Sequence, residues 1–509
     1  MRQGTGPDGP DDAPEGGAAG AERCPFGSGS ALPLHGSAAN DVPWERLRGR
    51  YGGLVPVEIG PGVPGWLLLG YKENLQVLRD QDHFSADPRP WSPRGTAPVR
   101  SAALARDGEE HQRLRIPLVE ALARVGTPQL VPVVERAAVH LIGRVAADGS
   151  ADLIDQYAAP LPALVLNELF GLPDVYGRLL ADLTLRLWSA DPDRAEPAAL
   201  AIRAYFTGLV ARKRAEPGED VTSWLLAHPH GLTDEEAVAS LSLLWETGHE
   251  PTTHLIGNAL LTLLEDPRVW TAYLGGTLTP EDFVDYVMWT DPPIRMLAGR
   301  YSTADIRFAG ASIRQGEPLL FGFASAHTDP SVFQGGDEAM AMAGNRSHLL
   351  WGAGAHRCPA TGFSRELVRT ALDIAVDRMR GMALAVEPHE LRRRGSPAVH
   401  GLAGLPVWFT PTGERAEPAA AQEEPTAAPV RRWIRKRRST PSQGARYQAP
   451  LAREDTAEER VVRAPATGAR SRPRRPPQGA GARYQAPFAE EEILPDPLER
   501  LLATWRPGG

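Results

Sequence analysis

The sequence predicts a mainly α-helical protein with small β-sheets, built as a single large domain with an extension at each end. Apolar residues recur at helical spacing over long stretches, strand-like runs are few and short, and both chain ends lack large apolar residues. Such ends cannot bury enough apolar area to offset the entropy of ordering their backbone. We therefore expect a disordered arm over residues 1–40, a folded domain over 41–413 and a disordered tail over 414–509.

The elements of the folded domain follow from these patterns. Helical periodicity is clearest over residues 128–146, 151–171, 234–265 and 363–380. Strand signals come as two pairs separated by turn residues, 55–59 with 65–70 and 306–308 with 318–323, and as one run at 407–409. Helices therefore outweigh strands, as in a helical body that carries small sheets.

Charge and cysteine content narrow the class of protein. The net charge of −8 argues against nucleic-acid binding by the whole chain, so we expect no nucleic-acid partner. Two cysteines in 509 residues, Cys24 and Cys358, favour a reducing compartment. The start of the chain has no apolar signal-peptide core, and no run approaches the length of a transmembrane helix. These features predict a soluble cytoplasmic protein.

The tail carries three separate features. The heptapeptide Gly-Ala-Arg-Tyr-Gln-Ala-Pro occurs at 444–450 and again at 481–487, as a duplicated linear motif would. The basic block 431–438 suits an acidic membrane surface, nucleic acid or an acidic protein, and a solvated, disordered linker is the alternative. Apolar residues in 494–505 are spaced as in a short amphipathic helix, which we expect to fold on a protein partner: Leu498, Leu501, Leu502 and Trp505.

The segment from Trp351 to Gly362 places Cys358 on a glycine-rich turn just before a predicted helix. The glycines let the backbone approach a flat ligand without Cβ clashes. The unpaired N–H groups at the helix start favour a thiolate, which can ligate a metal. A buried, inert cysteine is the alternative, since free cysteine packs well as a small apolar residue.

This segment resembles the haem-binding loop of the cytochrome P450 family, Phe-Gly-x-Gly-x-His-x-Cys-x-Gly. Trp351 stands for the Phe and Ala360 for the last Gly. The resemblance implies the P450 fold and heme b, with the thiolate of Cys358 as axial ligand of the iron. It also implies that Trp351, Gly352 and His356 bind the cofactor, with His356 donating to a haem propionate.

Two further segments resemble the family's propionate-binding residues. In 107–115, His111 and Arg115 are four apart and share one helix face, as the family's His-x-x-x-Arg does. Arg300 takes the position of an arginine that reaches a propionate from a strand. Alone, the His111 and Arg115 pair would read as a solvated charged face.

The stretch 243–258 resembles the family's central helix, Ala-Gly-x-Glu-Thr-Thr-Thr. The resemblance implies that Gly248 leaves room for dioxygen and that Glu250 is the acid in proton delivery. Pro251 replaces the usual alcohol, so we expect Thr252, one residue on, to supply the hydroxyl, with His249 nearby. Thr252 stands about 100° around the helix, so this requires a distortion that shifts the helical register or a bridging water. A solvent-facing glutamate is the alternative for Glu250.

A fourth segment departs from the family's pattern. Aligned on the two prolines at 292–293, Tyr286 and Trp289 stand for the Glu and Arg of the Glu-x-x-Arg motif, and Glu338 stands for the arginine that completes the triad. If only one of the three charged residues were replaced, a buried charge would remain unpaired, so their joint replacement avoids that cost. The segment resembles a bacterial P450 subset that lacks the motif.

The resemblance implies a monooxygenase that inserts one oxygen atom from O2 into a small hydrophobic organic substrate. It implies electrons from a ferredoxin and its reductase, because the chain shows no flavin or iron–sulfur segment. The alternative, motivated by Pro251 and the other departures, is a haem protein with a regulatory, partner-subunit or peroxide-driven role. We expect substrate access near loops at 85–100 and 172–200, with Arg89, Trp91 and Trp188 beside it.

Overall fold

We describe the structure from a computed structural model. It covers residues 31–34, 42–91, 102–187, 192–333, 340–394, 398–413 and 496–505. Cys24, Trp188, Glu338, the basic block and both heptapeptide copies lie outside the described residues. Within the described ranges, none of the helices combines the length and the apolarity that crossing a membrane requires.

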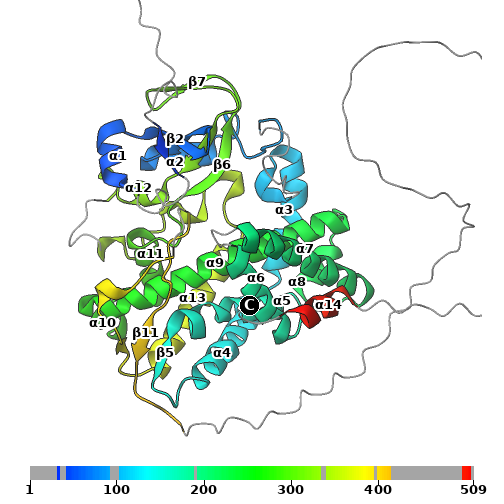
Figure 1. The fold of residues 1–509 in the computed structure, drawn as a ribbon, viewed down its shortest axis with the longest axis vertical. Helices are drawn as coiled ribbons and strands as arrows, with labels where there is room; N and C mark the ends of the chain where they lie inside the picture. Colours follow the sequence, from blue (N-terminus) through cyan, green and yellow to red (C-terminus); the bar gives the residue numbers. More distant parts are fainter. Residues whose placement is uncertain are drawn as a thin grey trace, which may run out of the picture. The chain divides into compact units, whose positions relative to one another are not determined.

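Helices make up most of the described chain (Figure 1). The α-helices are α1 Trp44–Tyr51, α2 Tyr71–Arg79, α3 Gly108–Ala123, α4 Thr127–Gly143, α5 Pro160–Leu169, α6 Asp174–Leu187, α7 Pro192–Ala215, α8 Val221–Leu226, α9 Asp234–Glu265, α10 Pro267–Leu274, α11 Pro280–Thr290, α12 Phe323–His327, α13 Thr361–Arg378 and α14 Pro497–Thr504. Short turns of helix are η2 Ala103–Ala105, the π-helical η3 Ile154–Ala158, η5 Leu349–Trp351, η6 Gly354–His356 and η7 Pro388–Glu390.

Strands form three small sheets in the described chain. The largest has the order β1-β2-β3-β9-β6-β4, from β1 Leu32–Pro33, β2 Leu54–Gly60, β3 Val63–Leu68, β9 Pro318–Phe321, β6 Leu297–Ser302 and β4 Phe84–Ser85. A second joins β10 Ala383–Leu384, β11 Pro406–Trp408 and β5 Ser150–Asp152, and a third pairs β7 Ile306–Phe308 with β8 Ala311–Ile313. The mainly α fold with small sheets is therefore confirmed.

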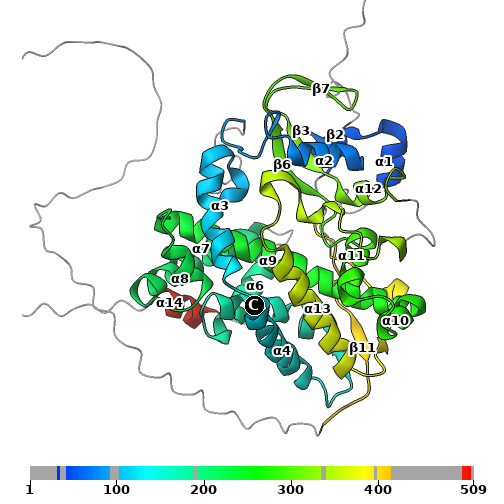
Figure 2. The same ribbon diagram turned by 180° about the vertical axis from the view of Figure 1, so that it is seen from behind.

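Helix α9 forms the centre of the helical part, as Figures 1 and 2 show. It packs against α5, α7, α11 and α13, and its 32 residues begin with a capping box in which Thr233 and Glu236 satisfy each other's backbone N–H groups. Trp245 and Leu260 are fully buried in the core that it shares with its neighbours. The sheet of β1–β4, β6 and β9 lies at the other end with α1 and α2 (Figure 2).

Most predicted elements are present, with three differences. The stretch 151–171 begins as β5 and a π-helical turn, and the regular helix starts only at Pro160, because proline suits the first turn of a helix. Strand β7 pairs with β8, and β9 pairs instead with β3 and β6. The expected access loop 172–200 is mostly helix, formed by α6 and the first residues of α7.

The amphipathic helix predicted near the C-terminus is also present, as α14. It packs against α7 of the same chain, so these residues of the expected disordered tail belong to the folded unit. Leu498 is fully buried there, and Leu501, Leu502 and Trp505 pack at the edge of the core. The expected protein partner is therefore, in this structure, the chain itself.

Candidate active site

The loop before α13 holds Cys358 in a fixed backbone frame. The Cys358 N–H donates to the carbonyl of Trp351 over 2.7 Å, which closes the turn. Gly352 has a φ of 67°, a left-handed conformation that favours glycine. The hydroxyl of Thr361, in the first turn of α13, donates to the Cys358 carbonyl over 3.1 Å. The loop therefore presents the sulfur directly before the N-terminus of α13.

Opposing effects act on the pKa of the Cys358 thiol. Burial raises the pKa of Cys358, whereas the backbone N–H of Ala360, the charge of Arg115 and the hydroxyl of Thr361 act in the opposite direction. Burial prevails, so the pKa of the free thiol lies above its ordinary value. A metal cation on the sulfur would reverse this balance, because a coordinating thiol is deprotonated outright.

His111 and His356 lie side by side near this loop. Their ring centroids are 4.1 Å apart, and both side chains are buried. Burial, together with the charges of His356 and Arg115, lowers the pKa of His111 to about 4. The Nε2 atom of His111 is buried and has no hydrogen-bond partner among the described residues. It therefore leaves room for a partner that the described part of the chain does not supply.

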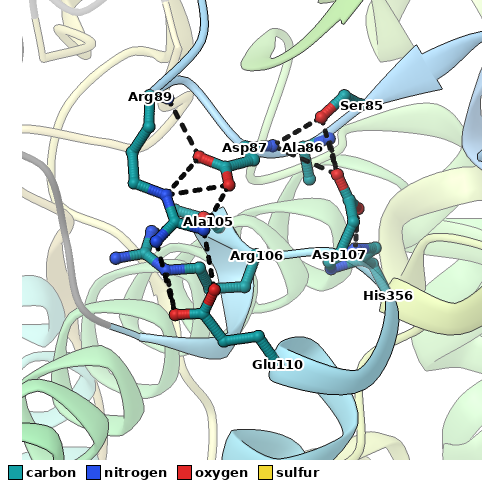
Figure 3. Close-up of polar contacts among 9 residues, drawn as sticks. All are labelled: Ser85, Ala86, Asp87, Arg89, Ala105, Arg106, Asp107, Glu110 and His356. Atoms are coloured by element: carbon teal, nitrogen blue, oxygen red, sulfur yellow. Dashed lines mark hydrogen bonds and ion pairs between the residues drawn. The ribbon is translucent and has the colours of Figure 1, made fainter.

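Asp107 fixes His356 from the other side (Figure 3). Its Oδ1 atom lies 3.2 Å from His356 Nε2, and its Oδ2 atom accepts the Ser85 hydroxyl at 2.7 Å and the Ala86 N–H at 2.8 Å. Burial would raise the pKa of Asp107, but these hydrogen bonds hold it well below its usual range. One carboxylate thus ties β4, the start of α3 and the cysteine loop together.

Arg300 on β6 is a buried cation with little neutralisation. Its side chain is only 6% exposed, and its hydrogen bond goes to the carbonyl of the adjacent Gly299. Burial lowers the pKa of Arg300 to about 10, which still leaves it charged at neutral pH. No carboxylate of the described chain forms an ion pair with it, although the more distant Asp107 favours its charge.

Arg115 also lies beside the cysteine loop. It donates to the carbonyl of Arg357, the residue before Cys358. The charge of Arg300 also lowers the pKa of His111 and His356, so these groups lie near one another. A buried arginine and an orphan histidine nitrogen beside a cysteine loop suit a ligand that carries carboxylates and a metal. The residues present therefore fit a haem with its propionates.

Glu250 forms a separate buried cluster on α9. Its Oε1 atom accepts from His254 Nε2 over 2.9 Å, and His249 Nδ1 lies 3.8 Å from Oε2. Arg394 Nη1 is 3.7 Å from Oε1. Burial would raise the pKa of Glu250, but His254, His249 and Arg394 hold it below its ordinary value. Glu250 therefore does not face solvent.

Pro251 does not interrupt α9, which continues as an α-helix on both sides of it. Thr252 is 6% exposed and takes the next position around the helix, so the shift of register that would bring it to the place of Pro251 does not occur. Thr247 lies one turn before Pro251 on the same face and is exposed. Its backbone carbonyl receives no helical N–H, since proline has none.

Comparisons with known proteins agree with this site. The chain is 29% identical over 390 residues to the cytochrome P450 monooxygenase PikC of Streptomyces venezuelae, which covers 73% of this chain and 91% of that protein. It is 28% identical to cytochrome P450 107B1 of Saccharopolyspora erythraea, over 68% of this chain and 89% of the other. The chain matches no protein-family model.

Solved structures lead to the same family. Testosterone-bound CYP154C4 from Streptomyces superposes with a TM-score of 0.67 at 27% identity, over 76% of this chain and all of that chain. P450BioI in complex with an acyl carrier protein superposes with a TM-score of 0.64 at 26% identity, over 72% of this chain and 97% of that chain. This chain belongs to the cytochrome P450 family. It is accordingly a P450 enzyme that uses heme b with a cysteine thiolate ligand.

The segment that we aligned with the family's Glu-x-x-Arg motif forms α11. Tyr286 and Trp289 are buried there, and Trp289 Nε1 donates to the Asn345 carbonyl over 2.8 Å. One residue before Tyr286, Asp285 is 0% exposed and accepts from both terminal nitrogens of Arg365 on α13. That ion pair was not expected from the sequence, because Asp285 falls outside the motif.

Sequence reasoning also missed His254, although its spacing of four from Glu250 on a helix is a usable signal. Gly248 faces α5, since a Cβ there would lie 3.4 Å from Leu166. Its predicted role beside dioxygen stays a prediction. Arg89, expected near the access loops, binds Asp87 and Glu110, as Figure 3 shows.

Proposed function

We propose that this P450 binds haem through Cys358, with His111, Arg115, Arg300 and His356 neutralising the propionates and with Trp351 and Gly352 shaping the loop. It is a haem-thiolate monooxygenase, and we propose that it inserts one oxygen atom into a small hydrophobic organic substrate. The buried Arg300, without a carboxylate partner in the described chain, is the observation that carries the assignment of the site.

Bound haem with a thiolate ligand supplies the activation of dioxygen. The chain's own residues have three tasks around it. Four donors would hold the propionates, the loop would keep Cys358 in position, and residues of α9 would deliver protons. We assign Glu250 as the buried acid, held ionised by His254, and Thr247 as the hydroxyl that takes the place of the missing alcohol at Pro251. Thr252, the residue first expected, is the competing assignment.

One face of α9 supports a hydrophobic substrate. Leu244, Thr247 and Pro251 follow one another at helical spacing, and each remains half-buried or exposed. Two of these side chains are apolar, and the third offers one hydroxyl. We infer that this face turns toward the haem and the substrate. Relatives are named a 2-hydroxy-5-methyl-1-naphthoate 7-hydroxylase and a mycinamicin IV hydroxylase/epoxidase, both enzymes of organic molecules.

Electrons must come from a redox partner, and we propose a ferredoxin with its reductase. The cytoplasmic location stays a prediction that rests on the scarcity of cysteine. If the ferredoxin docks near the Cys358 loop, its contact surface should be acidic, because Arg357 is exposed next to Cys358. The regulatory, partner-subunit or peroxide-driven role is the alternative function, and Pro251 is the observation that favours it.

Absorbance spectroscopy tests the site. The reduced carbon monoxide complex of the purified protein should show the red-shifted Soret band of a thiolate-ligated haem. Cys358→Ala should lose that band, and Cys24→Ala should keep it as the matched control. A wild-type protein that binds haem without the shift, or a Cys358→Ala variant that keeps it, would overturn the ligand assignment.

Turnover separates the two functions. A substrate panel is first screened by the substrate-induced Soret shift, and binders are then tested with ferredoxin, reductase and NAD(P)H, or with hydrogen peroxide alone. Oxygenated product in the ferredoxin arm supports the monooxygenase. Product only in the peroxide arm supports a peroxide-driven enzyme. Reduction that yields hydrogen peroxide without product from every binder contradicts the monooxygenase and favours the regulatory or partner-subunit role.

A further inference from the structure

The C-terminal helix α14 packs on a surface of α6 and α7 that includes Asp182, Gly208 and Arg212. We call this surface the α14 seat. Asp496 caps α14 by accepting the Leu498 N–H over 2.8 Å, and the same side chain pairs with Arg212 on α7, with Nε at 3.1 Å. At the other end of α14, Trp505 Nε1 donates to Asp182 on α6 over 2.8 Å. Polar contacts therefore fix both ends of an eight-residue helix.

Between these ends the contact is apolar and closely fitted. Leu498 is 0% exposed, and it lies over Gly208 of α7. A Cβ at position 208 would stand 2.7 Å from Leu498 Cγ, which is closer than real contacts allow. A glycine in a helix interior is less favourable than an alanine. The absence of a side chain at this position makes room for Leu498.

The seat connects to the active-site helix through α6. Asp182, which binds Trp505, and Thr184, which accepts from Trp245 of α9, both belong to α6. Trp245 stacks on His249 with centroids 4.9 Å apart, and His249 adjoins Glu250. Hydrogen bonds on Asp182 and Thr184 thus connect α14 to α9 through α6.

We propose that the surface of α6 and α7 is a docking site for an amphipathic helix, that α14 is its occupant, and that docking holds α6 against α9 in the substrate-binding arrangement. The link to substrate binding rests on the proposed function, whereas the docking itself does not. Undocking α14 is expected to weaken substrate binding without removing haem.

Hydrogen exchange on the full chain tests the docking. Leu498→Asp places a charge in the apolar seat, and Gly208→Val fills the seat from the opposite side. Both variants should expose the amides of α14 to exchange at least tenfold faster than wild type, and Arg500→Ala, on the exposed side of α14, should not. Unchanged exchange in both seat variants would overturn the docking.

Rescue in trans tests the coupling. A peptide of residues 494–509 added to full-length Leu498→Asp should bind and restore the substrate dissociation constant, which we expect to be raised several-fold. The same peptide carrying Leu498→Asp is the control. A variant whose α14 is free but whose substrate titration matches wild type would overturn the coupling alone. A wild type that binds no substrate in the panel, yet shows the exchange differences, would count against the proposed function and not against the docking.

Discussion

His254 donates from Nε2 to Glu250 Oε1 over 2.9 Å, one turn further along α9, in a part of the core where both side chains are almost fully buried. Glu250 Oε2 has no hydrogen-bond partner among the described residues, and neither has His254 Nδ1. A buried carboxylate with one satisfied oxygen depends strongly on that single donor. This pair therefore controls the protonation of the proposed acid.

Removing His254 should move the pH profile of turnover. In His254→Phe, burial of Glu250 is no longer opposed by its hydrogen bond, so the pKa of Glu250 should rise and the acidic limb of the kcat profile should shift to higher pH. Glu250→Gln should lower kcat about 10²-fold at all pH values. His389→Phe, at an exposed position, is the control. Equal pH profiles in His254→Phe and wild type would contradict this relationship.

The hydroxyl of proton delivery should be that of Thr247. Thr247→Val is expected to lower coupling, measured as product formed per NAD(P)H consumed, and to raise peroxide release, because it removes the hydroxyl on the exposed face of α9. Thr252→Val is the matched substitution at a buried position, and its coupling should stay near wild type. A loss of coupling confined to Thr252→Val would restore the first expectation.

Arg300 should lower the stability of the haem-free protein and raise its affinity for haem. A buried charge without an ion-pair partner is costly, so Arg300→Met should leave the haem-free protein as stable as wild type or more stable. The same variant should lose haem to apomyoglobin faster, by about tenfold, because it lacks a charge-assisted donor. Urea unfolding and haem-transfer kinetics measure the two effects. Arg314→Met is the exposed control, and lower stability with unchanged haem transfer would contradict the assignment.

The pH dependence of the haem-free protein should report His111. Its pKa is about 4 in the folded protein, which is below its ordinary value, so the unfolded chain takes up the proton first. The free energy of unfolding should therefore fall as the pH drops from about 6.5 toward 4. His356, Arg115 and Arg300 disfavour the proton on His111, and Asp107 favours it.

Two comparisons isolate this contribution. His111→Gln should flatten the slope of stability against pH between these values, and bound haem should flatten it too, because propionates favour the protonated ring. Unfolding followed by circular dichroism over this pH range is the measurement. A His111→Gln slope equal to that of wild type would show that other groups dominate.

The sequence was most informative where a periodic pattern or a local motif carries the structure. The range 234–265, predicted from apolar spacing, matches α9 to the residue. The capping box of Thr233 and Glu236 explains why the helix begins there. The donors around Cys358 come from three distant segments, and only the resemblance to a family brought them together. Contacts between side chains that no pattern links, such as His111 with His356, appear only in three dimensions.

Other features could not be predicted for physical reasons. The pairing of β7 with β8 depends on a tight turn that competes with a longer-range pairing. The seat of α14 depends on the complementarity of Leu498 with Gly208 on α7, a helix that was not among those predicted from the sequence. Asp285 is one acidic residue among many, and only its complete burial beside Arg365 distinguishes it.

Restoring the family's charged pair should destabilise this P450. In Tyr286→Glu with Trp289→Arg, two buried aromatic side chains are lost, including the Trp289 hydrogen bond to Asn345. The new charges enter the core, and the new arginine stands one helical turn after Asp285, which Arg365 already neutralises. We expect a loss of about 3–5 kcal/mol in the free energy of unfolding, measured with urea. Trp289→Phe keeps a ring and should cost less, mainly the hydrogen bond, at about 1 kcal/mol. A double variant as stable as wild type would show that the aromatic pair does not replace the charges by packing.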